Sequence, residues 1–279
     1  MYPSARVILD SISPTGVRLT TMEVTIHRFV LAEFNTHRVF SRNSASSRAI
    51  PVEKMIAKAV SDPAIPLSWP AEQKGMQGGE NLSLSQEAAA YEVWYRARLA
   101  MIESARRLTA IGLHKSVVNR LLEPFLPHTI IVSSTEWANF FDQRCSPLAQ
   151  PEMRVAAEQM RGAYLESTPQ PLDYGQWHTP YIREEDAELD PLRDRLYVSA
   201  ARCARVSHLT HDGRRDVQED MGLFSRLVSA RPGHWSPLEH VATPVPLHRY
   251  APGNLKGYYQ LRHQFEWASE AQIEEVDES

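Results

Sequence analysis

The residues best suited to chemistry lie in one short stretch, residues 36–48. Its thirteen residues include three arginines, one histidine, one asparagine and four serines, and no acid. Arginine offers a rigid fork of donors, and serine and asparagine add neutral donors, so this composition suits a bound anion such as phosphate. The alternative is a basic loop that faces an acidic surface of the same protein, because ordinary surfaces mix charges of both signs.

Two more clusters could bind an anion. Arg144 comes just before a predicted helix, where its charge and the helix dipole can act together on an anion or polarise an oxygen. It could instead pair with Asp142 or Glu152. Asn119-Arg120 ends another predicted helix, a place that favours a cation even without a ligand.

A fourth cluster, residues 234–240, crowds two histidines, a serine and a glutamate into one turn. Its spacing matches no zinc pattern, and no serine of the chain that we considered, Ser46 or Ser236, lies in a nucleophile elbow. We therefore expect no metal site and no serine nucleophile.

Helices and strands of mixed order must position these clusters. Alternating or β-branched apolar residues predict strands at 6–11, 22–26, 129–134 and 241–247. Helical spacing predicts helices at 27–35, 52–60, 84–111, 115–122, 136–143, 149–164, 192–206, 216–230 and 253–267. The irregular order favours an α+β fold over a doubly wound sheet. The basic stretch becomes the loop that leaves the helix at 27–35.

Two segments fit no regular element. Residues 62–83 are irregular, as in a binding loop or a disordered insertion. Residues 166–193 are rich in proline and acid and predict a linker or a surface excursion.

The composition is that of a soluble globular protein. The chain has 279 residues, of which 43% are hydrophobic and 23% charged, and a net charge of −4. This charge argues against an RNA-binding or other nucleic-acid-binding module, so any anion site must be local. Two cysteines form no disulfide scaffold or zinc motif, and we expect a cytoplasmic protein without signal peptide or membrane span.

Taken together, the motifs resemble those of the flavin-dependent thymidylate synthases. Their first signature is matched by His37-Arg38, Asn43, Ser46 and Arg48. Their second is matched at Asn139, Gln143-Arg144, Ala149-Gln150, Glu152 and Met153-Arg154, and a helix end of the family resembles Arg120 with Glu123-Pro124.

Two more family motifs stand in an unusual place. Residues 203–207 (Cys-Ala-Arg-Val-Ser) and 234–240 match motifs that usually precede the basic stretch, but here they follow it. The chain therefore looks circularly permuted, which adjacent termini permit. The resemblance covers about 22–160 and 200–246, and leaves 62–83 and 166–193 unexplained.

The resemblance implies one large α+β domain over residues 1–279, with a small antiparallel sheet flanked by helices. It implies an FAD-dependent methyltransferase, a homotetramer that makes dTMP from dUMP with methylenetetrahydrofolate and NADPH. Arg144 would be catalytic, activating the uracil. By position, the cofactor would contact His37, Arg38, Asn43, Asn139, His234 and Ser236, and the substrate would contact Glu33, Ser44, Ser46, Ser47, Arg48 and Arg120.

Two departures keep other activities open. Thr36 stands where the family has an arginine, and Glu33 where it has a glutamine. A flavin-dependent pyrimidine nucleotide hydroxymethylase and a non-catalytic nucleotide-binding homologue therefore remain alternatives.

Overall fold

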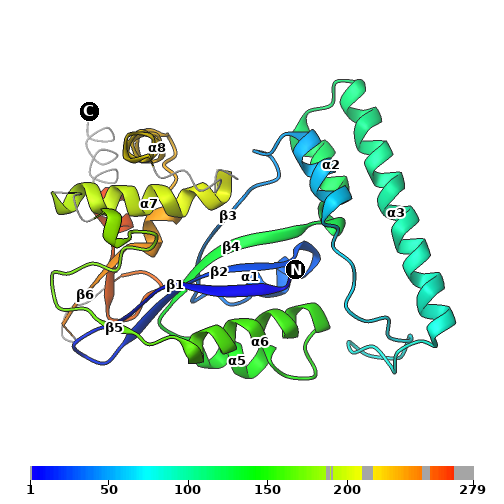
Figure 1. Ribbon diagram of the computed structural model, residues 1–279, viewed down its shortest axis with the longest axis horizontal. Helices are drawn as coiled ribbons and strands as arrows, with labels where there is room; N and C mark the ends of the chain where they lie inside the picture. The colour runs from blue at the N-terminus through cyan, green and yellow to red at the C-terminus, as the bar shows by residue number, and fades with distance from the viewer. Residues whose placement is uncertain (1, 187–188, 190, 209–215, 247–251, 267–279) are drawn as a thin grey trace, which may run out of the picture.

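The fold is built on a five-stranded sheet in the order β3-β4-β2-β1-β5, seen in a computed structural model that describes residues 2–186, 189, 191–208, 216–246 and 252–266 (Figure 1). All neighbouring pairs are antiparallel except β1 and β5, which are parallel. A second, antiparallel sheet pairs β6 with β7. The strands are β1 Ser4–Ile12, β2 Arg18–His27, β3 Ser41–Ser44, β4 Pro127–Ser134, β5 Gln170–Pro171, β6 Ala242–Pro244 and β7 Tyr258–Gln260.

Helices surround the main sheet, and the predicted α+β class is confirmed. The α-helices are α1 Leu31–Asn35, α2 Val52–Ser61, α3 Leu84–Ala110, α4 Lys115–Val118, α5 Ala138–Arg144, α6 Pro151–Glu166, α7 Leu192–His208 and α8 Val217–Ser229. Short 3₁₀ helices are η1 Arg28–Val30, η2 Asn119–Leu121, η3 Glu123–Phe125, η4 Glu184–Asp186 and η5 Ser236–His240. No described helix is long and apolar enough to cross a membrane.

Strand β4 separates two cores because successive side chains of a strand point to opposite faces. Ile130 and Val132 lie in the core that α6 covers through residues such as Met153. Ile131, between them, packs with Cys203 of α7 on the other face. The main sheet is thus sandwiched between α6 and α7 (Figure 1).

Helices α2 and α3 form a third core beside the sheet (Figure 1). On α3, however, only Ile102 and Ala105 are buried, although the helix is 27 residues long. Several apolar side chains elsewhere on α3 are exposed, including Leu84, Val93 and Leu99.

Two expectations from the sequence were wrong. Residues 41–44 form strand β3 rather than loop, because they pair with β4 from Ser41–Ser133 to Ser44–Ile130. The helix expected from residue 253 is a turn and then strand β7, and helical residues begin only at 262. Residues 166–193, expected to be a linker or a surface excursion, contribute β5 and η4. Residue 247, the last of the strand expected at 241–247, and residue 267, the last of the helix expected at 253–267, lie outside the described residues.

Candidate functional site

Arg144, at the end of α5, is held by the turn that follows α1. Its Nε donates to Nε2 of His37 at 2.8 Å, and Nη2 donates to Oγ1 of Thr36 at 2.9 Å. A longer bond of 3.4 Å joins Nη2 to the backbone oxygen of Glu33. His37 and Arg144 are 107 positions apart in the sequence. The three residues that Arg144 contacts, Glu33, Thr36 and His37, are all positions that the motifs indicate.

Burial and the neighbouring positive charges keep His37 neutral. Burial, followed by the positive charges of Arg144 and Arg42, lowers the pKa of His37 to about 4. A guanidinium can only donate, so Nε2 of His37 accepts and its hydrogen is on Nδ1. The ring is packed edge-on against Phe140, with 4.9 Å between centroids, which fixes its orientation.

A second cluster joins β3 to the C-terminal part of the chain. Asn43 donates from Nδ2 to the backbone oxygen of Cys203 at 2.9 Å, and its Oδ1 accepts from Oγ of Ser236 at 3.2 Å. The two motifs that looked displaced in the sequence, at 203–207 and 234–240, therefore meet at the basic stretch. This contact is what a circular permutation requires.

Asn119 supports the loop that follows β3. Its Nδ2 donates to the backbone oxygens of Ser47 at 2.7 Å and Ile50 at 2.9 Å, and Asn119 is fully buried. The loop presents Ser46 and Arg48, both exposed. No local signal in the sequence indicates that Asn119 reaches a loop some 70 residues away.

The remaining predicted contacts divide by exposure. Arg38, Asn139 and His234 are exposed, Ser44 is half-buried, and Ser47 is fully buried with no partner for its hydroxyl among the described residues. Arg120 is exposed but pairs with Glu123 at 2.8 Å. The same carboxylate also forms an ion pair with Arg28.

A buried chain of hydroxyls and imidazoles crosses the sheet near the second cluster. His178 contacts Oγ of Ser11 and Oγ1 of Thr21, each at 2.8 Å. Thr21 contacts Ser133 at 2.5 Å, and Ser133 contacts Nδ1 of His240 at 2.8 Å. Burial lowers the pKa of both His178 and His240 to about 3, so both rings are neutral at pH 7.

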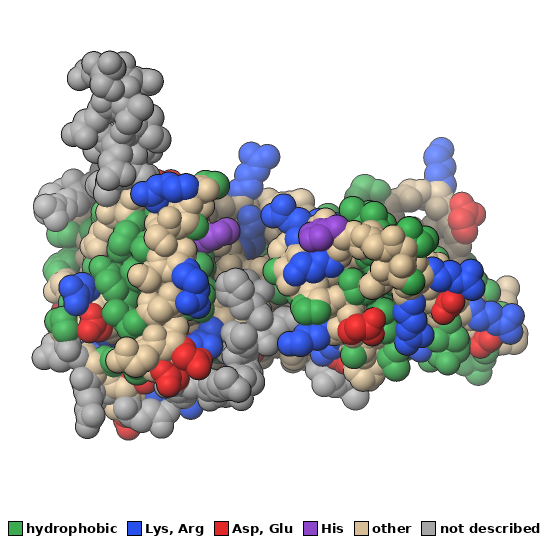
Figure 2. Space-filling view, turned by 90° about the horizontal axis from the view of Figure 1, so that it is seen from above, with side chains coloured by type: hydrophobic (Ala, Val, Ile, Leu, Met, Phe, Trp, Pro, Cys, Tyr) green, Lys and Arg blue, Asp and Glu red, His purple; other side chains and the backbone are tan. Residues whose placement is uncertain are grey.

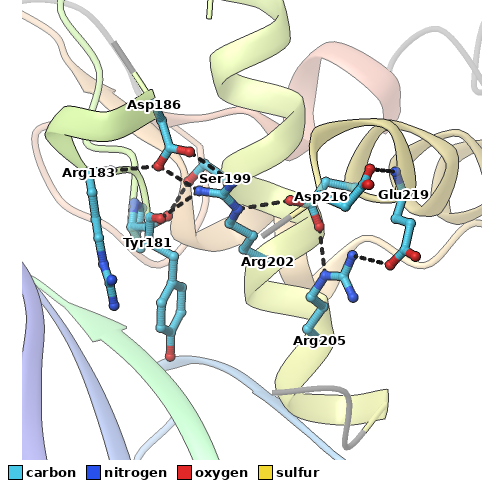
Figure 3. Close-up of polar contacts among 10 residues, drawn as sticks. Tyr181, Arg183, Asp186, Ser199, Arg202, Arg205, Asp216 and Glu219 are labelled. Atoms are coloured by element: carbon cyan, nitrogen blue, oxygen red, sulfur yellow. Dashed lines mark hydrogen bonds and ion pairs between the residues drawn. The ribbon is translucent and has the colours of Figure 1, made fainter. Parts of the chain in front are cut away.

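Residues 167–186, which we call the strap, connect the main sheet to α7. Tyr181 donates to Glu23 of β2 at 2.9 Å, and its backbone oxygen accepts from Arg202 of α7 at 3.0 Å. Arg202 also pairs with Asp186 of the strap at 2.7 Å (Figure 3). It pairs in addition with Asp220 of α8 at 2.9 Å. The strap is therefore a fixed part of the fold.

Positive charge is local despite the net negative charge of the chain. Figure 2 shows basic side chains beside the histidines on one face of the molecule. No carboxylate is among the side chains predicted to hold the cofactor, and Arg38 has no ion pair within the described residues. This set of cationic, amide and hydroxyl donors fits an anionic dinucleotide such as FAD.

Comparisons with known proteins agree with the motifs. Residues 13–170 match the family model "Thy1: Thymidylate synthase complementing protein". No curated protein sequence matches significantly. Two structures of the UMP/dUMP methylase PolB from Streptomyces cacaoi are similar at low identity. The structure with 5-Br UMP has 16% identity and a TM-score of 0.47, covering 58% of this chain and 88% of that one. The structure with 5-Br dUMP has 18% identity and a TM-score of 0.43, covering 53% and 67%.

Proposed function

Because the chain belongs to the thymidylate synthase complementing protein family, we propose that it is a flavin-dependent thymidylate synthase. It converts dUMP to dTMP, with methylenetetrahydrofolate as the carbon donor and NADPH as the reductant. The observation that supports this most is the fixed guanidinium of Arg144.

One guanidinium nitrogen of Arg144, Nη1, is available to bind a substrate. Its Nε and Nη2 bind within the chain, whereas Nη1 has no bond to another described residue. A guanidinium stays charged at any working pH and stabilises negative charge that develops on a pyrimidine ring. Because His37 is neutral, it orients Arg144 without competing for that charge.

The loop after β3 would hold the nucleotide. Arg48 is exposed, has no ion pair among the described residues and lies two positions from the exposed hydroxyl of Ser46. Together with Arg120 they offer the donors that a phosphate needs. The other proposed substrate contacts are Ser44, Ser47 and Glu33. Asn119 keeps this loop in place by holding two of its carbonyl oxygens.

The cofactor would be held by His37, Arg38, Asn43, Asn139, His234 and Ser236. FAD, when bound, supplies the reducing equivalents that turn the transferred one-carbon unit into a methyl group. The hydrogen bond from Ser236 to Asn43 holds η5 against β3, and so keeps donors from both halves of the chain on one site.

A homotetramer is part of the proposal. Exposed apolar side chains on α3, such as Tyr91, Val93 and Leu99, make a surface that a second copy of the chain could cover. Arg48, Arg120 and Arg144 would then meet the same nucleotide from more than one subunit.

A flavin-dependent hydroxymethylase is the second candidate, and Thr36 favours it. Its neutral hydroxyl accepts from Arg144 where the family has an arginine, so the site carries one positive charge less. The third candidate, a nucleotide-binding homologue without turnover, rests on the same substitution.

The absorbance spectrum of the purified protein with and without FAD tests the flavin. We expect a bound flavin spectrum, and a colourless protein that does not bind added FAD would refute both enzyme candidates. Product analysis from dUMP and methylenetetrahydrofolate then separates dTMP from a hydroxymethylated nucleotide. NADPH oxidation that depends on dUMP would exclude the non-catalytic homologue.

A further inference from the structure

A cleft between α2 and the start of β4 takes no part in the proposed reaction. It encloses about 230 Å³, and its charged or titratable lining residues are Arg28, Lys54, Lys58 and His128. No carboxylate lines it, and the other lining residues are apolar or neutral. None of the proposed substrate contacts is among the residues that line it, although Arg28 also lines the neighbouring pocket to which Arg120 belongs.

His128 lines this cleft and carries a buried hydrogen-bond donor. Nη1 of Arg28 lies 2.8 Å from Nδ1 of His128. Since a guanidinium can only donate, Nδ1 accepts, and the ring hydrogen must be on Nε2. Burial and the charge of Arg28 lower the pKa of His128 to about 3, so the ring is neutral at pH 7. His128 is 4% exposed, yet its Nε2 has no hydrogen-bond partner among the described residues.

Arg28 adds a second donor of the same kind. Its Nη2 pairs with Glu123 at 3.0 Å, but its buried Nε has no partner in the described part of the chain. Buried donors without a partner are rare in folded proteins, and each such group calls for an unseen ligand, ion or water. Nε2 of His128 and Nε of Arg28 are two such donors, and both residues line this cleft. Their presence favours a bound hydrogen-bond acceptor there.

Two lysines complete the cationic side. Lys54 and Lys58 are four residues apart on α2 and therefore lie on the same face, where like charges repel. Asp62 neutralises Lys58 at 2.8 Å, whereas Lys54 forms no ion pair with any residue that the structure describes. An anion in the cleft would relieve this repulsion and satisfy the buried donors together.

We propose that this cleft binds a phosphomonoester. The phosphate is bound by Lys54, Arg28 and His128, and a small organic part lies against Met55 and Leu126. The volume limits the ligand to a small one, since sites for larger ligands enclose at least about 300 Å³. Ala45 and Ile50 also line the cleft, so an occupant contacts the inner side of the loop that carries Ser46 and Arg48.

Two measurements on the full chain with inorganic phosphate test this site. In NMR spectra selective for histidine rings, phosphate should shift the Nε2–H signal of His128, assigned with His128→Gln. In calorimetry, Lys54→Ala should weaken phosphate binding at this site about ten-fold or more, since hydrogen bonds to charged groups are strong. Lys54→Arg should restore it, because it restores the charge.

Two control variants distinguish this site from other causes. Lys74→Ala removes the same charge from an exposed loop outside the cleft and should leave phosphate binding unchanged. Arg48→Ala should also leave the shift at His128 unchanged, even if it weakens dUMP binding.

The proposal is overturned if phosphate does not shift the His128 signal, if Lys54→Ala and Lys74→Ala weaken binding equally, or if only Arg48→Ala abolishes it. Neither result depends on flavin. A colourless protein that binds phosphate here would refute the proposed function and leave this site standing.

Discussion

Nε of Arg144 donates to Nε2 of His37 across 2.8 Å, and this bond holds the guanidinium in place before any substrate arrives. The histidine accepts only while it is neutral, and its lowered pKa of about 4 keeps it so at pH 7. A charged group that is held rigidly loses little freedom when a ligand binds, which is the basis of electrostatic preorganisation.

Arg144→Ala should lower kcat by about two to three orders of magnitude, the loss seen when one preorganised donor is removed. The oligomer should persist, because Arg144 contributes no core side chain. Steady-state kinetics and size-exclusion chromatography check both. Arg161→Ala, an exposed arginine of α6, is the control, and near-normal turnover of Arg144→Ala would show that the catalytic assignment is wrong.

Arg48→Ala should weaken dUMP binding about ten- to a hundred-fold, since a hydrogen bond to a charged group contributes about 1.5–3 kcal/mol. The effect should appear in Kd and KM more than in kcat. Arg120→Ala should cost less, because Arg120 is already paired with Glu123. Unchanged dUMP affinity in Arg48→Ala, measured by calorimetry, would exclude this residue from the phosphate site.

Asn119→Ala should raise the KM for dUMP and leave kcat close to normal, because the loop of Ser46 and Arg48 loses two anchors. Leaving the carbonyl oxygens of Ser47 and Ile50 without a buried partner should also cost about 1–3 kcal/mol of stability. Lys115→Ala removes the exposed bond from Nζ to the backbone oxygen of Ala49 and is the milder control. If Asn119→Ala and Lys115→Ala change kcat and KM to the same extent, Asn119 does not position the loop.

The protein should lose stability as the pH falls from about 6.5 to 4. His37, His128, His178 and His240 have pKa values lowered from 6.5 to about 3 or 4 by burial. In this window the unfolded chain binds protons that the folded chain refuses, so their contribution is complete above pH 6.5 and falls below it. Each fully linked histidine adds a slope of about 1.4 kcal/mol per pH unit.

Chemical denaturation at pH 5 and 7 measures that slope. His178→Gln keeps a polar side chain for Ser11 and Thr21 but cannot take up the proton, so its slope should be shallower than that of the parent. An identical slope would show that His178 does not titrate on unfolding.

Arg202→Ala should destabilise the fold by about 3–5 kcal/mol, because it leaves Asp186 and Asp220 as buried charges without their partner. Arg193→Ala breaks an exposed pair with Asp194 and should cost at most about 1 kcal/mol. Urea denaturation compares the two, and similar losses would mean that the buried network does not hold the strap.

The parts of the fold that the sequence predicts are those with local signals. Alternating Met22, Val24 and Ile26 indicated β2 because one face of that strand is fully buried. Pro51 and the apolar spacing after it indicated α2, which begins at Val52. Strand β3 had no such signal, since its residues Ser41 to Ser44 are all polar and become a strand only by pairing with β4.

The candidate site was predictable in its residues and not in its contacts. Glu33, Thr36, His37 and Arg144 were each indicated by position in a motif, and the structure brings them together. The partners of Asn119 and His178 were not indicated, because their bonds depend on how distant segments pack. His178 lies in a segment that its prolines and acids made look like a linker.

The bond between Ser236 and Asn43 closes a loop of 193 residues, which has a consequence for how the chain folds during synthesis. Contacts of such large separation form late, because the closure of long loops must precede them. While the ribosome makes the chain, β1 to β4 and α6 emerge and can assemble long before α7 and η5 exist. Until then, the face of β4 that carries Ile131 lacks its cover, and Asn43 lacks both of its partners. The two proposed cofactor contacts Asn43 and Ser236 can therefore meet only after α7 and η5 have been made and have closed over the sheet.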